Sequence, residues 1–564
     1  MTMTAQVVGA IPDARGLNLY RADRDAAALF GFYMPDTLFR HLDPHLDRLG
    51  ALAGGHLDEL AATADRNPPT LRLRRRTGED CAIVEKHPAY VEMERLAYAE
   101  FGLAALSHRG GVLGWPEPML PAAKYALTYL FVQAEFGLCC PVSMTDSLTR
   151  TLKRYGDPAL VERFFSRLTS LDFDTLAQGA MFMTEQGAGS DVAATTTRAE
   201  EQADGTWRLT GDKWFCSNAD ADLAMVLARS EPVSGLKGVS LFLLPKQRRD
   251  GLPNDFRILR LKDKLGTRSM ASGEIRLEGA EAYLVGERGR GFHQMADMIN
   301  NSRLSNGVRA AGLMRRAATE ALFIACRRQA FGRPLIALPL MRRQLAKMLV
   351  WTEQARTMVF LTADALHRAN GGDPEAARLT RILTPLIKFR ACRDARRVTG
   401  DAMEVRGGCG YIEEWSDPRL VRDAHLGSIW EGTSNIVALD VLRAITRDTA
   451  LPALRTHLKE LLDAAQLDRA EREAFEAAFA RACAFAEAAA REASDTLARQ
   501  AASGLYHAVT AAGLAREAAG AGLPHRLALA HLVLTHRLAP RDPLSSPDDA
   551  GLIDAVLDAA VTPA

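Results

Sequence analysis

The spacing of apolar residues changes twice along this chain of 564 residues, and these two changes restrict the folds open to it. Up to about residue 176 the apolar residues recur at helical intervals, as at Leu42, Leu46 and Leu49. From 177 to 286, short apolar runs and alternating segments such as 274–278 indicate strands. Helical spacing then returns. The pattern predicts an α+β protein in which a β-rich domain separates two helical regions.

Five segments are expected from this pattern. They are an irregular arm (1–40), an N-terminal α-helical domain (41–176), a central β domain (177–286), a C-terminal four-helix bundle (287–450) and an additional helical domain (451–564). Within the β domain, the alternating residues 207–210 lead to an expected turn at Gly211 and Asp212. The bundle helices are expected at about 292–330, 338–370, 374–405 and 434–447.

Charge and cysteine usage exclude several kinds of protein. The net charge is +1, so nothing global favours a nucleic-acid or membrane partner. No run of about 18 uninterrupted apolar residues is present, and residues 1–27 lack the apolar core of a signal peptide. The eight cysteines form no Cys-x-x-Cys pair and no zinc or iron–sulfur spacing. We therefore expect a reduced cytoplasmic protein without a bound metal.

One carboxylate stands in an unusual setting. Glu431 lies between Trp430 and a Gly-Thr-Ser turn, and a helix with apolar residues at helical spacing follows. Thr433 or Ser434 can cap that helix, and a Glu just before a helix start lies near the positive end of its dipole. Taken alone, an acidic residue that merely stabilises the helix start is the more common explanation.

Four other segments combine glycine, aromatic or arginine residues. Residues 183–191 form a Gly-rich stretch that allows close backbone approach to a flat or anionic ligand, or simply connects two domains. Residues 213–218 place two aromatics and a hydroxyl at a strand end, which suits a planar cofactor or a hydrophobic core. Residues 328–332 and 406–411 set Arg beside Gly, as in phosphate recognition or at an ordinary helix end.

Taken in order, these motifs resemble those of the acyl-CoA dehydrogenase family of flavoproteins. The resemblance rests on residues 183–191, 213–218, 264–269, 328–332 and 430–435. Segments 18–20, 67–69, 87–89, 140–145, 341–342 and 428–432 resemble the AidB-like branch of that family. The resemblance spans about residues 15–450. It implies an N-terminal helical domain, a central β-barrel domain and a C-terminal four-helix bundle, here followed by an extra helical domain.

The resemblance also implies FAD as the cofactor and a homotetramer as the assembly. The residues matched to FAD contacts within one subunit are Met183, Thr184, Gly189, Ser190, Phe215, Ser217, Trp430, Thr433 and Asn435. Those matched to contacts with the FAD of a neighbouring subunit are Arg328, Phe331, Glu404, Gly407 and Gly408. Because the glycines leave room and the aromatics offer flat faces, these residue types suit such a ligand.

For the substrate, the resemblance implies an acyl-CoA and α,β-dehydrogenation in fatty acid or branched-chain amino acid catabolism. Glu431 occupies the position of the base that removes the α-proton, with Ser190, Arg303 and Gly432 near the substrate. The β-hydrogen would leave as a hydride to the flavin, and an electron-transfer flavoprotein would take the electrons. Ser302 stands at the alternative base position of isovaleryl-specific relatives and cannot act as a base. Trp430 replaces the family's usual Tyr, which leaves the acyl-chain length open.

An AidB-like stress protein that binds duplex DNA is the alternative function. A DNA-binding region should be basic. Residues 451–564 carry 11 Lys and Arg against 15 Asp and Glu, a net charge of −4. Only a local stripe of Arg516, Arg526, Arg537 and Arg541 could face phosphates. We therefore expect duplex DNA binding to be weak and favour the enzyme.

Overall fold

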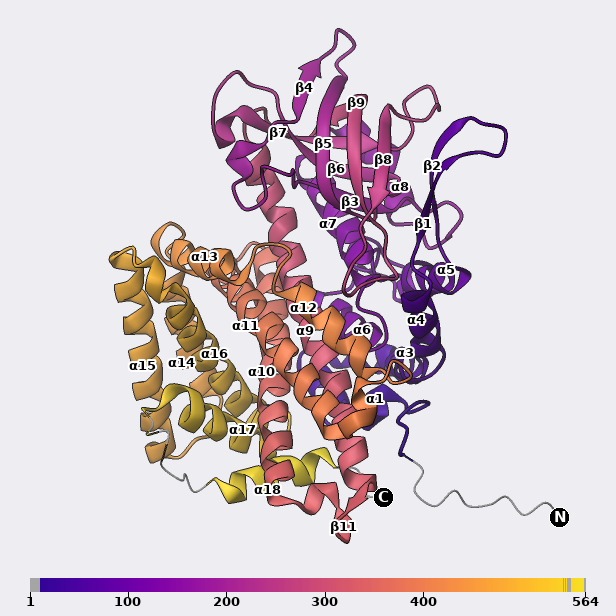
Figure 1. Cartoon of the computed structure of the whole chain (residues 1–564). Coiled ribbons are helices and arrows are strands. Elements are labelled where there is room, and N and C mark those ends of the chain that lie inside the picture. Colours follow the sequence, from indigo (N-terminus) through magenta and orange to yellow (C-terminus); the bar gives the residue numbers. More distant parts are fainter. Residues whose placement is uncertain (1–10, 541, 543, 545–548, 562–564) are drawn as a thin grey trace, which may run out of the picture.

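The computed structural model describes residues 11–540, 542, 544 and 549–561 (Figure 1). Its N-terminal region contains eight α-helices: α1 (Leu19–Ala22), α2 (Ala26–Phe32), α3 (Asp36–Gly54), α4 (His56–Arg66), α5 (Pro88–Glu94), α6 (Pro121–Phe131), α7 (Cys139–Tyr155) and α8 (Pro158–Leu168). The expected irregular arm is wrong within the described residues. There, Asn18 caps α1 by accepting from the amides of Tyr20 and Arg21, and α3 already begins at Asp36.

A two-stranded hairpin interrupts this helical region, where the spacing predicted only helices. Its strands are β1 (Thr70–Arg74) and β2 (Asp80–Glu85), and the hairpin stands away from the helices beside it (Figure 1). Most of its side chains are exposed or half-buried, including Leu73. Leu71, Ala82 and Val84 pack against the barrel core but are only partly buried, and β1 has just two apolar residues, so the alternation is too short to reveal the strands.

The central domain is a closed sheet of short strands. They are β3 (Gly179–Phe182), β4 (Arg198–Glu201), β5 (Trp207–Ser217), β6 (Leu223–Arg229), β7 (Val239–Pro245), β8 (Phe256–Leu261) and β9 (Ser272–Leu284). Hydrogen-bonded pairing runs from β4 to β5, β9, β7 and β6, and β6 pairs with β4 again. This ring confirms the predicted β-barrel domain, with β3 and β8 added to its edges.

The expected turn at Gly211 is wrong, because β5 passes straight through it. Gly211 has φ +146°, and a Cβ there would lie 2.8 Å from Thr197 Cα. β5 pairs with β4 and β9 on its two sides, and its pairing with β9 shifts register beside the glycine. Glycine here therefore marks a close approach and a bulge within a strand, not the end of one.

The predicted four-helix bundle is present as α9 (Gly291–Arg327), α10 (Pro339–Asn370), α11 (Pro374–Arg406) and α13 (Ser434–Thr446). Asp373 caps α11 by accepting from the amides of Glu375 and Ala376, directly before Pro374 at the first turn. A further helix, α12 (Asp417–Gly427), was not predicted. None of the described helices is long and apolar enough to cross a membrane.

The C-terminal helices lie along the bundle on the side away from the β1–β2 hairpin (Figure 1). They are α14 (Ala450–Asp463), α15 (Arg469–Arg491), α16 (Ala498–Gly520), α17 (His525–Val533) and α18 (Ala550–Ala560). Helix α16 packs against α10, α11 and α13. A Cβ on Gly513 would lie 2.5 Å from Thr357 on α10, so this glycine permits the close helix contact.

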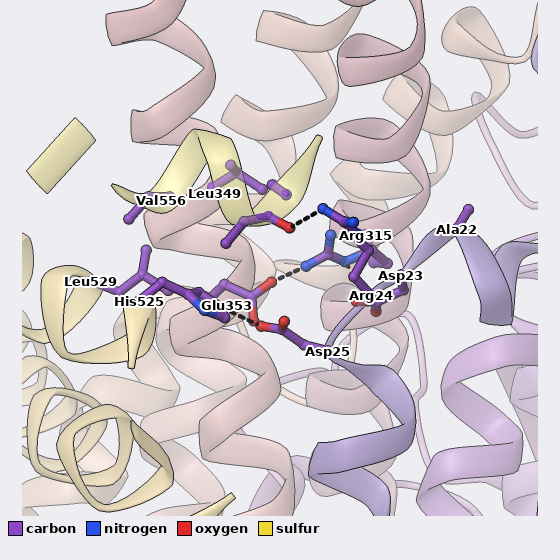
Figure 2. Close-up of a pocket in the computed structure, with 12 residues that line it drawn as sticks. Ala22, Asp23, Arg24, Asp25, Arg315, Leu349, Glu353, His525, Leu529 and Val556 are labelled. Carbon is purple, nitrogen blue, oxygen red and sulfur yellow. Dashed lines mark hydrogen bonds and ion pairs between the residues drawn. The ribbon is translucent and has the colours of Figure 1, made fainter. Parts of the chain in front are cut away.

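Buried ion pairs join the C-terminal helices to the bundle and to the N-terminal segment. Asp23 and Asp25 from the N-terminal segment, Glu353 from α10 and His525 from α17 converge on a cavity of ≈ 30 Å³ (Figure 2). Arg526 is fully buried and donates from Nη1 to Glu353 at 2.7 Å and from Nε to Glu517 at 2.8 Å. Charges that far from water are stable only when paired. This cluster, which we call the tri-domain ion cluster, therefore holds three regions of the chain together.

Candidate active site

Glu431 sits in the short turn between α12 and α13. Its backbone has φ 56° and that of Gly432 has φ 97°, so two consecutive residues are left-handed. Left-handed backbone strains a residue with a side chain, while glycine adopts it freely. Thr433 is the N-cap of α13, as expected, but its side chain makes no capping hydrogen bond. The turn is therefore held by other groups.

Two cations on bundle helices fix this turn. Arg303 on α9 donates from Nε to the Glu431 carbonyl at 3.0 Å and pairs through Nη1 with Asp440 at 2.7 Å. Lys388 on α11 donates from Nζ to the Gly427 carbonyl at 2.5 Å and to the Gly432 carbonyl at 3.4 Å. Arg303, which the resemblance places near the substrate, thus contacts the backbone of Glu431 directly.

The Glu431 carboxyl group is poised to exchange a proton. Its Oε2 is buried and accepts no hydrogen bond from any residue that the structure describes. Burial raises the pKa of Glu431 above its ordinary value, although Arg303 and Lys388 oppose that rise. Burial also lowers the pKa of Lys388 to about 8. A carboxylate with a raised pKa and a free oxygen in a strained turn is well suited to act as a general base.

Trp430 forms one wall beside the carboxylate. Its ring stacks on that of Phe136 from the N-terminal region, with centroids 6.0 Å apart and planes 14° from parallel. The guanidinium of Arg309 lies 4.6 Å from the Trp430 ring centroid. Phe136, Arg309 and Lys388 were missed by sequence reasoning. A signal existed for Lys388, because a lone lysine interrupts the apolar run of residues 386–389.

The Gly-rich loop predicted to touch the cofactor lies beside the end of β5. The Trp214 amide donates to the Thr184 carbonyl at 2.9 Å, which brings Met183 and Thr184 near Phe215 and Ser217. Gly189 and Ser190 are exposed farther along the loop. The structure therefore assembles these predicted residues at one edge of the barrel.

Glu185 holds the Gly-rich loop in place through contacts of its carboxylate. It accepts from the fully buried Lys213 Nζ at 2.7 Å and from the hydroxyls of Thr196 and Thr197 at 2.7 and 2.6 Å. Although burial alone would raise it, Lys213 and these hydrogen bonds bring the pKa of Glu185 to about 2. The family that the sequence resembles commonly has Glu-Pro-Gly here, and this chain has Glu185-Gln186-Gly187. The contacts of Glu185 therefore form without that proline.

The residues at this edge fit a large flat ligand. The Phe215 side chain is 60% exposed, which is costly for an aromatic ring unless something covers it. A Cβ added at Gly187 or Gly189 would meet no atom within 4 Å. Ser217 lies two residues beyond Phe215 and supplies a hydroxyl, while Thr184 adds a second. An apolar face flanked by hydroxyls and open glycines matches an isoalloxazine ring and its polar edge.

A second group of predicted residues gathers at the far end of the bundle. Arg328 Nη1 donates to the Arg406 carbonyl at 2.7 Å, which places it next to Gly407. The rest of this group lies nearby: Phe331 is 91% exposed in the turn after α9, and Glu404 and Gly408 are close to Gly407. The distance from Arg303, which contacts Glu431, to Arg328 is roughly 37 Å along α9, at 1.5 Å per residue. One chain therefore does not bring Arg328 and its neighbours close to the turn that carries Glu431.

The segment 264–269 joins all three family domains. The Thr267 amide donates to Asp423 on α12 at 2.6 Å, and Ser269 Oγ donates to Glu135 at 2.8 Å. Burial and the neighbouring Glu135 raise the pKa of Asp423 to about 7. Thr433 and Asn435, by contrast, are exposed at the start of α13 and are free to meet a ligand.

The pKa of Asp423 predicts a pH-dependent stability. The folded protein holds a proton that the unfolded chain, with an ordinary Asp pKa near 3.9, releases. Stability is therefore full below about pH 4 and falls as the pH rises through 7, by up to ~1.4 kcal/mol per pH unit. In Asp423→Asn, which keeps the acceptor for Thr267, we expect urea unfolding to show higher stability than the parent at pH 8. A variant less stable than the parent at pH 8, with the same pH slope, would contradict this assignment.

Three family models match consecutive parts of the chain. Residues 10–175 match the N-terminal domain of the adaptive response protein AidB. Residues 180–280 match the middle domain of acyl-CoA dehydrogenases, and residues 289–446 match their C-terminal domain. These matches follow the order of helical region, barrel and bundle seen in the structure.

Individual relatives agree with these models. The chain is 36% identical to Escherichia coli AidB over 404 residues, which is 70% of this chain and 72% of that protein. It is 33% identical to acyl-CoA dehydrogenase family member 11 of Caenorhabditis elegans, over 76% of this chain and 71% of the relative. The crystal structure of Caenorhabditis elegans ACDH-11 in complex with C11-CoA superposes with a TM-score of 0.87 at 28% identity, covering 95% of this chain and 94% of that one. The chain therefore belongs to the acyl-CoA dehydrogenase family of FAD-dependent oxidoreductases, in the branch with an AidB-type N-terminal domain.

Proposed function

We propose that Glu431 is the base of an acyl-CoA dehydrogenase reaction and removes the α-proton of the thioester. The observation that carries this proposal is the buried, unpartnered Oε2 of Glu431 with its raised pKa. The α-proton of a thioester is weakly acidic, so its base must be held close and partly desolvated. The chemistry that bound FAD supplies is acceptance of the β-hydrogen as a hydride.

The backbone of the same turn serves the developing negative charge. The Glu431 N–H makes no hydrogen bond to any part of the chain that the structure describes. The free amide of the base residue itself is a suitable donor to the thioester oxygen as charge grows on it. Arg303 and Lys388 hold the surrounding carbonyls, so this donor is positioned before the reaction begins. Gly432 would contact the substrate through its backbone, and Ser190 would contact the acyl-CoA from the loop.

FAD would be held by residues from two subunits. The loop and strand-end group (Met183, Thr184, Gly189, Ser190, Phe215 and Ser217), with Trp430, Thr433 and Asn435, would bind it within one subunit. Arg328, Phe331, Glu404, Gly407 and Gly408 would reach the FAD of a neighbour. The roughly 37 Å between the groups along α9 supports this division. As the resemblance implies, the assembly would be a homotetramer in the cytoplasm that passes its electrons to an electron-transfer flavoprotein.

An anaerobic titration tests the proposed reaction. The purified protein should be yellow, and a panel of acyl-CoAs from branched short chains to long ones should include a class that bleaches the flavin band. Such a class would place the enzyme in fatty acid or branched-chain amino acid catabolism. A flavin band that no acyl-CoA bleaches would contradict the proposal.

Duplex DNA remains the alternative ligand, and we expect it to bind weakly. Arg526, one of the four arginines of the predicted stripe, is fully buried in the tri-domain ion cluster and unavailable to phosphates. Arg516 packs over the ring of Phe32, and Arg541 lies outside the described residues. In a gel-shift titration we expect no sub-micromolar binding to duplex DNA at physiological salt. A sub-micromolar affinity that falls steeply with salt would overturn this prediction.

A further inference from the structure

Arg309 is buried without a counter-ion. Five arginines have side chains less than 2% exposed, namely Arg309, Arg316, Arg356, Arg406 and Arg526. Four of them form ion pairs with at least two carboxylates each. For Arg309, no carboxylate in the described part of the chain lies within ion-pair distance. Burying a charge without a partner is expensive, so this exception points to a missing anion.

The surroundings of Arg309 only partly compensate its charge. The guanidinium lies over the rings of Trp430 and Phe136, at 4.6 and 5.6 Å from their centroids. Such contacts favour a cation by less than a desolvated charge requires. Its Nε donates to the Ser305 carbonyl at a long 3.3 Å. Its Nη1 has no hydrogen-bond partner among the described residues.

A second unused donor belongs to Trp430, the residue whose ring lies under the guanidinium. The indole N–H of Trp430 is buried and also lacks a partner among the described residues. Buried donors are normally satisfied, and each unsatisfied one destabilises the fold. The nearby thiols of Cys139, Cys140 and Cys392 supply no negative charge, because burial raises the pKa of each, although Cys140 interacts with Arg309 by a side-chain hydrogen bond. Two empty donors on contacting side chains, one of them charged, suit a group with two acceptor oxygens.

This donor pair adjoins the base. Trp430 directly precedes Glu431, and Arg309 is one of the cations whose field acts on the Glu431 carboxyl group. The other cations nearby are accounted for, because Arg303 pairs with Asp440 and Lys388 is held by carbonyl oxygens. A ligand that presents its thioester α-carbon to Glu431 would therefore have the far end of a short acyl group beside Arg309.

We propose that Arg309, with the Trp430 N–H, binds a carboxylate at the far end of the acyl group, so that the enzyme's substrates are short dicarboxylic acid monothioesters of coenzyme A. This inference rests on the proposed function, since it needs the acyl group to lie beside Glu431. A carboxylate supplies both the missing charge and two acceptor oxygens. A neutral branched acyl group of the same shape would leave both donors unpaired.

Paired ligands test the proposal without requiring turnover. The FAD-loaded Glu431→Gln protein would be titrated by calorimetry with glutaryl-CoA and with 5-methylhexanoyl-CoA, which has an isopropyl group in place of the carboxylate. We expect glutaryl-CoA to bind about 10- to 100-fold more tightly, the range of a charged hydrogen-bonded pair. Adding Arg309→Met should bring the ratio of the two Kd values close to 1, and Arg309→Lys should retain part of it.

The outcomes separate this inference from the proposed function. A ratio of 1 or below in the Glu431→Gln protein, or the same high ratio after Arg309→Met, would overturn the role of Arg309. If Arg309 serves only as a counter-charge to Glu431, its replacement would alter both ligands alike. By contrast, the Glu431→Gln protein could prefer glutaryl-CoA in binding while no acyl-CoA bleaches the flavin of the parent protein. That result would exclude Glu431 as the base and leave Arg309 as the carboxylate site. The ratio of the two Kd values in the Glu431→Gln protein is measured without any Arg309 variant, so misfolding of Arg309→Met would not obscure this first result.

Discussion

Replacing Glu431 by Gln is expected to lower kcat for acyl-CoA dehydrogenation by about 10²- to 10⁴-fold, the usual contribution of a positioned general base. Glutamine has nearly the same size and keeps an acceptor oxygen, but it cannot take the α-proton. The left-handed turn, which Arg303 and Lys388 hold through backbone carbonyls, needs no carboxylate and should persist. Binding of the acyl-CoA should therefore survive the loss of turnover.

The measurement is anaerobic single-turnover bleaching of the flavin, with substrate affinity measured separately by calorimetry. Glu414→Gln is a matched control, because Glu414 is an exposed glutamate in the stretch before α12. It should keep the parent rate. If Glu431→Gln retains a tenth or more of the parent rate, another group removes the proton and the base assignment is wrong.

Replacing Arg526 by Met is expected to destabilise the protein by about 3–5 kcal/mol, because it leaves buried carboxylates without their partner. Arg526 pairs with Glu353 on α10 and Glu517 on α16, and both are almost fully buried. Methionine fills a similar volume, so the loss comes from charge and hydrogen bonds more than from packing. The melting temperature, measured with bound FAD, should fall by several degrees.

Arg516→Met is the control for this prediction. Arg516 lies on α16 one residue before Glu517, stacks over the ring of Phe32, and forms no ion pair with a described carboxylate. Its loss should cost less than about 1 kcal/mol. Equal effects of the two substitutions would mean that the tri-domain ion cluster contributes no special stability. Hydrogen exchange in α16 and α17 would show whether the C-terminal helices open first in Arg526→Met.

The long bundle helices were predictable because their apolar residues repeat over thirty positions. The expected 374–405 and the observed α11 (Pro374–Arg406) differ by one residue. The β1–β2 hairpin was not predictable in the same way, since its strands are short and their few apolar residues are only partly buried against the barrel. Helix α1 depends on Asn18, whose side chain also binds the backbone and carboxylate of Asp47 far along the chain. Its stability therefore comes from a tertiary contact that no local window contains.

The residues of the candidate site also fall into a set that the sequence predicts and a set that it does not. Glu431, Arg303 and the Gly-rich loop carry local patterns, and the sequence predicts them with a resemblance to guide it. Arg309 carries no pattern of its own, and Lys388 shows only as a lone lysine in an apolar run. Their significance comes from what surrounds them: aromatic rings and carbonyls from distant segments, with no carboxylate for Arg309. Whether a buried cation has a counter-ion is a property of the folded chain and cannot be read from spacing.

The tri-domain ion cluster has a consequence for how the protein is made. Glu353 and Arg526 are 173 residues apart, so at about 5–20 residues per second the ribosome supplies the arginine roughly 10–35 s after the glutamate. During that interval Glu353, together with Asp25 from the start of the chain, must stay hydrated or rely on other cations. The bundle cannot close over that corner until one of the last helices emerges. If translation stops near residue 450, the released chain lacks the cation that pairs with these carboxylates. Protein quality control would then recognise the incompletely packed bundle.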